Sequence, residues 1–377
     1  LTPVFVEAAR QAGFDGNDDF NGVQQAGFGL YQTTTRAGRR CSSAVAYLNP
    51  ARRRKNLTVI TKATASRVLF DNGKASALVY AIDGKGGFCE AAGREIILCG
   101  GSINSPQLLM LSGIGPAAQL RRHGIEVLVD APGVGGNLQD HLDVCTLRKC
   151  TQDITYDSTN QALAGLQFLL FRQGPGTSNV AESGGFWRSP LAEDERPDIQ
   201  FHFVPAQLDD HGRNKLPGSG FTLHACFLRP KSRGRLYLTG NSVQNKPRIE
   251  AGYLGDAGGF DMKVMVEATK LSRRIFAQPA FDAFRGPEMF PGEAAQSDAE
   301  LEAFVREKAE SVYHPVGTCR MGAVDDIDAV VDSQCRVKGV DGLRVVDASV
   351  MPKLIGGNTN APTIMIAERV ADMILAG

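Results

Sequence analysis

Two loops near the end of the sequence carry side chains that could accept a proton and hydrogen-bond a polar ligand. Tyr313-His314-Pro315 provides an imidazole, and Gly356-Gly357-Asn358 provides an amide. A histidine has an ordinary pKa of about 6.5, so it can accept a proton near neutral pH. An amide donates and accepts hydrogen bonds but takes up no proton. The loops are far apart in the sequence, and we predict that tertiary structure brings His314 and Asn358 to one point.

Alcohol oxidation is one reaction in which such a pair could take part, and it requires two acceptors. The hydroxyl proton must pass to a base, and the hydrogen bound to carbon must leave as a hydride. No side chain accepts a hydride, so a redox cofactor is needed. In such a reaction the proton would go to His314 and the hydride to the cofactor.

The elements that must position the two loops can be read from the same region. Residues 343–347 form an apolar run that is typical of a buried strand, and a terminal helix begins at residues 360–362. The N-terminus of a helix carries roughly half a positive charge, which would lie next to Asn358. We expect the helix to pack on the core through an apolar stripe at helical spacing, formed by Ile366, Val370, Met373 and Ile374.

Three long blocks of sequence provide a further signal. The C-terminal block comprises residues 314–322, 343–352 and 356–367, the second block residues 99–116, and the third block residues 132–141. Taken in their order along the chain, the blocks resemble the glucose–methanol–choline (GMC) family of FAD-dependent oxidoreductases, and its choline-dehydrogenase-like and alcohol-dehydrogenase-like members in particular. The similarity extends over essentially the whole chain and is weakest in the middle.

The resemblance implies a role for individual residues. It assigns His314 as the catalytic base and Asn358 as the group that hydrogen-bonds the substrate oxygen, with hydride transfer to N5 of the flavin. The backbone of Asp347 and Ala348 would contact the ribityl–pyrophosphate region of FAD, and that of Ala65 the adenine. Further cofactor contacts are implied at Gly101, Asn358 and Thr359.

The chain departs from the family at its beginning. It has no initiating methionine, and it has no strand followed by G-x-G-x-x-G at the start of a helix, the usual flavin-dinucleotide motif. We therefore expect an α/β FAD-binding domain that lacks its N-terminal βαβ element, plus an α+β substrate domain with an antiparallel sheet. The expected segments are 1–56 at the active-site entrance, 57–144 in the FAD domain, 145–312 in the substrate domain, and 313–377 with the catalytic loops.

Local patterns predict individual elements. Asn72-Gly73 indicates a β-hairpin, and Ser105-Pro106 indicates the start of a helix at residue 107. Alternation of apolar and polar residues predicts a sheet in the middle of the chain. The expected strands are residues 57–61, 67–70, 75–82, 95–99, 198–203, 221–228 and 234–238, and the expected helices are residues 4–13, 107–111, 261–276 and 298–311.

Composition excludes several classes of function. Acidic and basic residues balance at 41 each, which gives no reason to expect nucleic acid as a partner. The eight cysteines lack zinc-site spacing, so no metal is expected and the cysteines should be reduced. His202, His211 and His224 are interpreted as structural or surface residues. No apolar run is long enough for a transmembrane segment, and a cytoplasmic location is expected, with peripheral association with the inner membrane as the alternative.

These observations lead to a functional hypothesis with three rivals. The hypothesis is FAD-dependent oxidation of a primary alcohol to an aldehyde, with electrons passed to an acceptor other than O2, such as a quinone. An alcohol oxidase that uses O2 is the first rival. A flavin-containing hydroxynitrile lyase, in which FAD does no redox work, is the second. The third is a non-catalytic fragment that cannot hold FAD.

Overall fold

The computed structural model describes residues 1–376, which form two compact units from discontinuous segments. The first unit comprises residues 1–50, 141–229 and 257–312, and the second comprises residues 51–140, 230–256 and 313–377. Residues 1–50 group with the sheet in the middle of the chain, and residues 230–256 group with the C-terminal loops.

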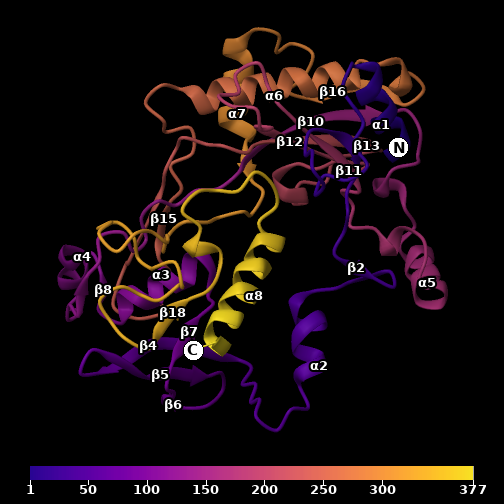
Figure 1. Ribbon diagram of the computed structural model, residues 1–377. Helices are drawn as coiled ribbons and strands as arrows, with labels where there is room; N and C mark the ends of the chain where they lie inside the picture. Colours follow the sequence, from indigo (N-terminus) through magenta and orange to yellow (C-terminus); the bar gives the residue numbers. More distant parts are fainter. Residues whose placement is uncertain (377) are drawn as a thin grey trace. The chain divides into compact units, whose positions relative to one another are not determined.

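The first unit is built on a seven-stranded sheet whose neighbouring strands are antiparallel (Figure 1). The strand order is β1-β11-β12-β13-β10-β16, and β17 also pairs with β10. The strands are β1 (Gly27–Leu30), β10 (Leu142–Cys150), β11 (Ser183–Trp187), β12 (Ile199–Val204), β13 (Gly220–Phe227), β16 (Arg285–Phe290) and β17 (Glu310–Ser311). Two of the expected strands correspond to β12 and β13, and the expected α+β architecture with an antiparallel sheet is confirmed.

One face of this sheet is aromatic and is covered by helices α1 (Thr2–Gln11) and α6 (Phe260–Phe276). The ring of Phe203 lies 4.8 Å from that of Phe5 in α1, and the ring of Phe221 lies 5.1 Å from that of Phe276 in α6. The opposite face carries polar side chains, because the alternate residues of β12 and β13 point away from the helices. This is the two-layer arrangement expected of an amphipathic sheet.

Shorter elements complete the first unit. α7 (Asp298–Lys308) begins with a capping box between Ser297 and Glu300 and packs against α6. The remaining elements are β2 (Thr35–Arg36), β3 (Arg39–Arg40), the π-helix Ala44–Leu48, α5 (Gln161–Phe171), and the 3₁₀ turns Tyr156–Ser158, Pro175–Thr177, Asp210–Gly212 and Pro279–Phe281. The short α2 (Asn49–Ala51) leads from the first unit into the second.

The second unit contains a three-stranded sheet of β4 (Ala63–Asp71), β5 (Lys74–Ile82) and β6 (Cys89–Ala92). The turn between β4 and β5 has positive φ at Asn72 (48°) and Gly73 (80°), so the predicted hairpin is confirmed. The strand predicted at residues 57–61 is wrong. Residues 57–60 are exposed and lie outside regular structure, because no neighbouring strand pairs with them among the described residues.

A parallel pair of strands, β7 (Ile96–Leu98) and β18 (Leu343–Val345), links distant parts of the second unit. Both strands were predicted, but only one face of β7 is buried, because Ile97 is 43% exposed. The helix after β7, α3 (Gly101–Leu111), begins six residues earlier than predicted. Ser105 is therefore not its N-cap, and Pro106 lies inside the helix.

Two contacts explain the early start of α3. Ser105 Oγ does not cap a helix at residue 107 but accepts the N–H of Gly100 at 2.9 Å. Pro106 has no N–H for the carbonyl of Ser102, four residues before it. The hydroxyl of Thr318 donates to that carbonyl at 2.7 Å instead, so the helix loses no buried hydrogen bond.

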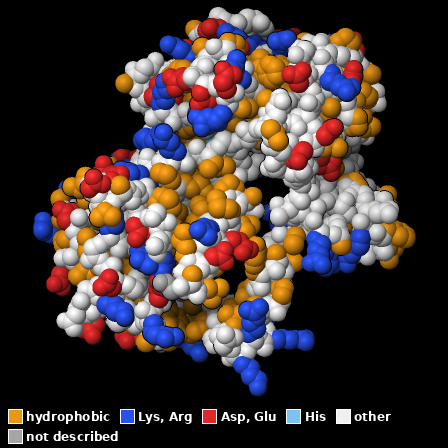
Figure 2. All heavy atoms as spheres, viewed as in Figure 1, with side chains coloured by type: hydrophobic (Ala, Val, Ile, Leu, Met, Phe, Trp, Pro, Cys, Tyr) orange, Lys and Arg blue, Asp and Glu red, His pale blue; other side chains and the backbone are white. Residues whose placement is uncertain are grey.

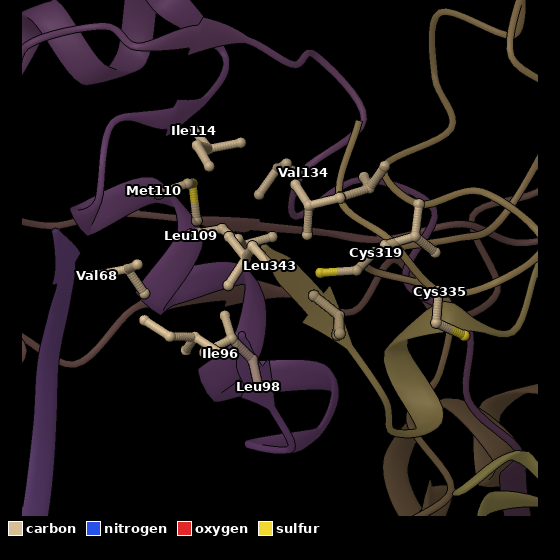
Figure 3. Packing of buried hydrophobic residues seen from close by; sticks show 14 of the residues in the cluster. Val68, Ile96, Leu98, Leu109, Met110, Ile114, Val134, Cys319, Cys335 and Leu343 are labelled. Atoms are coloured by element: carbon tan, nitrogen blue, oxygen red, sulfur yellow. The ribbon is translucent and has the colours of Figure 1, made fainter. Parts of the chain in front are cut away.

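The core of the second unit joins α3, β7 and β18 to the chain around Cys319 and Cys335 (Figure 3). Leu109 and Met110 of α3 are fully buried there. α8 (Asn360–Ala376) joins this core through Val370, with Ile366 and Ile374 packed against it, so these three positions of the predicted stripe are confirmed. The other elements are β8 (Ile114–Gly115), α4 (Ala117–Arg122), β9 (Val129–Asp130), β14 (Arg235–Tyr237), β15 (Arg248–Glu250) and the 3₁₀ turn Ala348–Val350.

Basic and acidic side chains are interspersed on the face seen in Figure 2, in keeping with the zero formal net charge. None of the helices within residues 1–376 is both long and apolar enough to span a bilayer.

Candidate active site

The loop that carries His314 is held by backbone contacts within the second unit. The N–H of His314 donates to Oδ1 of Asp140 at 2.9 Å, and the next residue, Pro315, accepts a hydrogen bond from the Ser102 hydroxyl at 2.6 Å. Tyr313 has a φ of 62°, which is unusual for a bulky residue and is maintained only where the surroundings determine it. The His314 side chain is therefore presented from a fixed backbone, and the residue is only 9% exposed.

The second loop brings Asn358 to the imidazole. Nδ2 of Asn358 lies 3.2 Å from Nε2 of His314, so the predicted meeting of the two groups is found in the structure. When the amide donates, Nε2 is the acceptor and carries the lone pair that a general base requires. α8 begins two residues later, at Asn360, and the partial positive charge of its N-terminus lies next to this loop.

Two further residues tie the loops together. Asn137 Nδ2 donates to the carbonyls of Gly317, three residues after His314, and Pro352, at 3.2 and 3.3 Å. Gln139 Nε2 also donates to Pro352, and the two residues lie in a turn-and-bridge segment before β10. The sequence predicted no role for these two amides, because hydrogen bonds to distant carbonyls leave no local pattern.

A second group of predicted residues surrounds the carboxyl ends of the parallel strands. Asp347 follows β18, and Gly101 follows β7 and opens α3. Oδ2 of Asp347 accepts the N–H of Gly101 at 2.9 Å and the hydroxyl of Ser105 at 2.6 Å. Oδ1 accepts the N–H of Ser349 at 2.8 Å. The carboxylate thus fastens the two strand ends to each other and to the start of α3.

The strand ends are suitable for holding a dinucleotide. Ligands of α/β sheets bind outside the carboxyl ends of parallel strands, beside helix N-termini. At Gly101, φ is 76° and an added Cβ would meet no atom within 4 Å, so the backbone there has open space beside it. A ligand could approach this backbone as closely as glycine allows. The residues present therefore fit the nucleotide part of a flavin cofactor.

The remaining predicted cofactor residues occupy three different places. Ala348 follows Asp347 and begins the 3₁₀ turn. The carbonyl of Thr359 accepts from the N–H and the hydroxyl of Thr363 in the first turn of α8. Ala65 lies in β4 at a register shift between β4 and β5. Their roles toward the cofactor stay predictions.

Comparison with known proteins assigns this chain to a family. The GMC oxidoreductase family models match residues 1–143 and 230–367. The chain is 46% identical over 379 residues to the oxygen-dependent choline dehydrogenase of Brucella ovis, covering 100% of this chain and 68% of that protein. It is 47% identical to the mitochondrial choline dehydrogenase of Mus musculus, covering 99% of this chain and 63% of that protein. The chain belongs to the GMC oxidoreductase family.

Solved structures with a similar fold support the same family assignment. Pyridoxine 4-oxidase from Mesorbium loti matches with a TM-score of 0.88 and 30% identity, covering 100% of this chain and 70% of that one. A formate oxidase from Aspergillus oryzae, studied for its FAD modification, matches with a TM-score of 0.91 and 25% identity, covering 99% of this chain and 70% of that one. The GMC oxidoreductase described here is thus a flavoprotein whose cofactor is FAD.

The polar face of the sheet in the first unit of this GMC oxidoreductase carries a buried ion pair. Asp143 Oδ2 lies 2.5 Å from Nδ1 of His224, and Sγ of Cys145 lies 3.2 Å from the same nitrogen. Burial lowers the pKa of His224, but the charge and hydrogen bond of Asp143 outweigh it and raise the pKa above its usual value. His211 and Glu310 form a second pair at 3.3 Å.

With Asp210 added to the second pair, each of the two groups has three described residues that could supply metal ligands. In the first group the carboxylate and imidazole already satisfy each other, which suits the structural role predicted for His224. That role stays a prediction. His202, which was also predicted to be a structural or surface residue, lies opposite His224 in the pairing of β12 with β13.

Proposed function

We propose that this GMC oxidoreductase oxidises a primary alcohol of the choline type to an aldehyde. The observation that carries the proposal is the 3.2 Å approach of Asn358 Nδ2 to His314 Nε2. The imidazole offers a proton acceptor and the amide a hydrogen-bond donor at the same point. The substrate class is inferred from the choline dehydrogenases to which the chain is similar.

The division of roles follows from what each side chain can do. His314 would take the hydroxyl proton on Nε2, because it is the only one of the two groups that can hold a proton at neutral pH. Asn358 would turn its N–H toward the substrate oxygen and orient the hydroxyl toward the imidazole. The N-terminus of α8 would favour negative charge beside this loop. Bound FAD supplies the hydride acceptor.

The cofactor would be held by backbone at the strand ends. Gly101 and Asp347 with Ala348 would line the ribityl–pyrophosphate part, and Thr359 with Asn358 the part nearest the substrate. Ala65 would face the adenine. The side chain of Asp347 would act from behind the cofactor, since its two oxygens are occupied by donors of the protein itself.

We propose further that the electrons pass to a carrier other than O2. The test is to add choline to the FAD-loaded protein without oxygen and to follow the visible flavin absorbance. Bleaching is expected, followed by recovery with an artificial quinone that is faster than recovery with air. Faster recovery with air would assign an oxidase instead. Conversion of a cyanohydrin without any bleaching by alcohols would overturn the proposal in favour of a lyase.

A further inference from the structure

The proposed base is anchored by a buried carboxylate that lies outside the two catalytic loops. Asp140 is 9% exposed, and its two oxygens have different partners in the second unit. Oδ1 accepts the backbone N–H of His314 at 2.9 Å, and Oδ2 accepts the hydroxyl of Tyr253 at 2.5 Å. Hydrogen bonds to an ionised acceptor are about twice as strong as those between neutral groups.

This bond restrains the part of the backbone that determines where the imidazole lies. The N–H of His314 belongs to the peptide that joins it to Tyr313, whose φ of 62° is strained. Fixing the orientation of that peptide fixes the direction of the Cα–Cβ bond of His314. On the other side, Val316 and Gln139 exchange two backbone hydrogen bonds of 2.8 and 3.1 Å. Residues 139–140 therefore hydrogen-bond the backbone both at His314 and two residues after it.

The carboxylate is itself fixed by an element from elsewhere in the sequence. Tyr253 lies in the segment 230–256, beyond strand β15. Because its hydroxyl occupies Oδ2, the carboxylate cannot rotate freely and Oδ1 stays directed at His314. Tyr253 thus fixes the carboxylate of Asp140, and that carboxylate fixes the backbone of His314.

We propose that Asp140, held by Tyr253, is a positioning residue that keeps His314 Nε2 in line with the substrate hydroxyl. The inference rests on the proposed function and deepens it. Asp140 does not act on the substrate: it acts through the imidazole. A misplacement of about 1 Å at a reacting group can reduce the rate about 100-fold.

The first test compares variants in the FAD-loaded protein by anaerobic reduction of the flavin with choline. Asp140→Ala should slow reduction about 100-fold at saturating choline, with little change in the choline concentration for half-saturation. Asp140→Asn should stay within about threefold, because the amide oxygen can still accept the N–H of His314. The rate of flavin reduction in Tyr253→Phe should lie between the rates of these two variants. The matched control is Asp332→Asn. The carboxylate of Asp332 also accepts backbone N–H groups, those of Gln334 and Arg336.

A double-variant comparison separates positioning from general loss of structure. If Asp140 acts through His314, the effect of Asp140→Ala should disappear when His314→Ala is already present. An equal effect in both backgrounds would overturn the proposal.

The second test does not depend on activity. The ring signals of His314, assigned by their loss in His314→Ala, should shift in NMR spectra of Asp140→Ala but not of Asp332→Asn. Unchanged ring signals in Asp140→Ala would overturn the positioning role. If instead His314→Ala reduces the flavin at the normal rate, the proposed function fails, and the ring signals still decide whether Asp140 positions the imidazole.

Discussion

Asp347 offers a sharp test of how the strand ends are held together. It is 5% exposed, and its carboxylate accepts four hydrogen bonds. Oδ2 accepts from Gly101 N–H and the Ser105 hydroxyl, and Oδ1 from the N–H and the hydroxyl of Ser349, the last at 2.5 Å. Asp347→Asn replaces one of these oxygens by an NH2 group, which cannot accept.

The cost follows from which donor loses its acceptor. Each oxygen accepts from one backbone N–H and one hydroxyl. In either orientation of the amide, one backbone N–H therefore loses its acceptor. The hydroxyl can turn and accept from the new NH2, but the N–H cannot. A buried donor without a partner costs about 1–3 kcal/mol, and loss of the charge weakens the two surviving bonds by about 1 kcal/mol in total. We expect a loss of about 2–4 kcal/mol in the free energy of unfolding.

Urea denaturation followed by circular dichroism measures this loss. The matched control is again Asp332→Asn. Both of its hydrogen bonds go to the single oxygen Oδ1, so the amide keeps its oxygen there and the change should stay within about 0.5 kcal/mol. A loss below about 0.5 kcal/mol for Asp347→Asn, or equal losses for the two variants, would refute the reasoning.

Three further predictions concern stability. Leu109→Ala, at a fully buried site of α3, should cost about 2–5 kcal/mol in urea unfolding. Thr318→Val should cost about 1–3 kcal/mol, because the Ser102 carbonyl opposite Pro106 loses its donor, and a cost near zero would show that the donor is unnecessary. His224→Gln should destabilise more at pH of about 6 than at about 9. The pKa of His224 is raised in the folded state, so the stability from its charged form is complete below the unfolded pKa of about 6.5 and is lost as pH rises through the folded pKa. A thermal melting difference between wild type and variant that is independent of pH would contradict this sign.

Several features could be predicted from the sequence because nearby residues determine them. Asn72-Gly73 favours a tight hairpin through its own backbone preferences, and the hairpin is present. The alternation in β12 and β13 reflects one buried and one polar face, and the sheet follows from it. The stripe of α8 predicts its buried side in the same way, with Val370 at the centre.

Other features depend on contacts between distant residues and leave no local pattern. Pro106 predicts a helix start, but the hydroxyl of Thr318 replaces the hydrogen bond that a proline inside α3 cannot donate. Residues 57–61 have the composition of a strand but no neighbour to pair with among the described residues.

The candidate site divides in the same way. Its acid–base chemistry could be predicted from residue types and the family resemblance, which singled out His314 and Asn358. The residues that hold the site in place could not be predicted. Nothing in the sequence indicates that a backbone N–H 174 residues away will donate to the carboxylate of Asp140.

The most direct test of the account is the rate of anaerobic flavin reduction by choline in His314→Ala, with Asn358→Ala measured beside it. Loss of a general base should slow reduction by about 10²–10⁴-fold in His314→Ala, while bound FAD and thermal stability stay at wild-type levels. Asn358→Ala should slow it less, since the base remains. Wild-type reduction rates in His314→Ala would contradict the central claim that this imidazole accepts the proton of the alcohol.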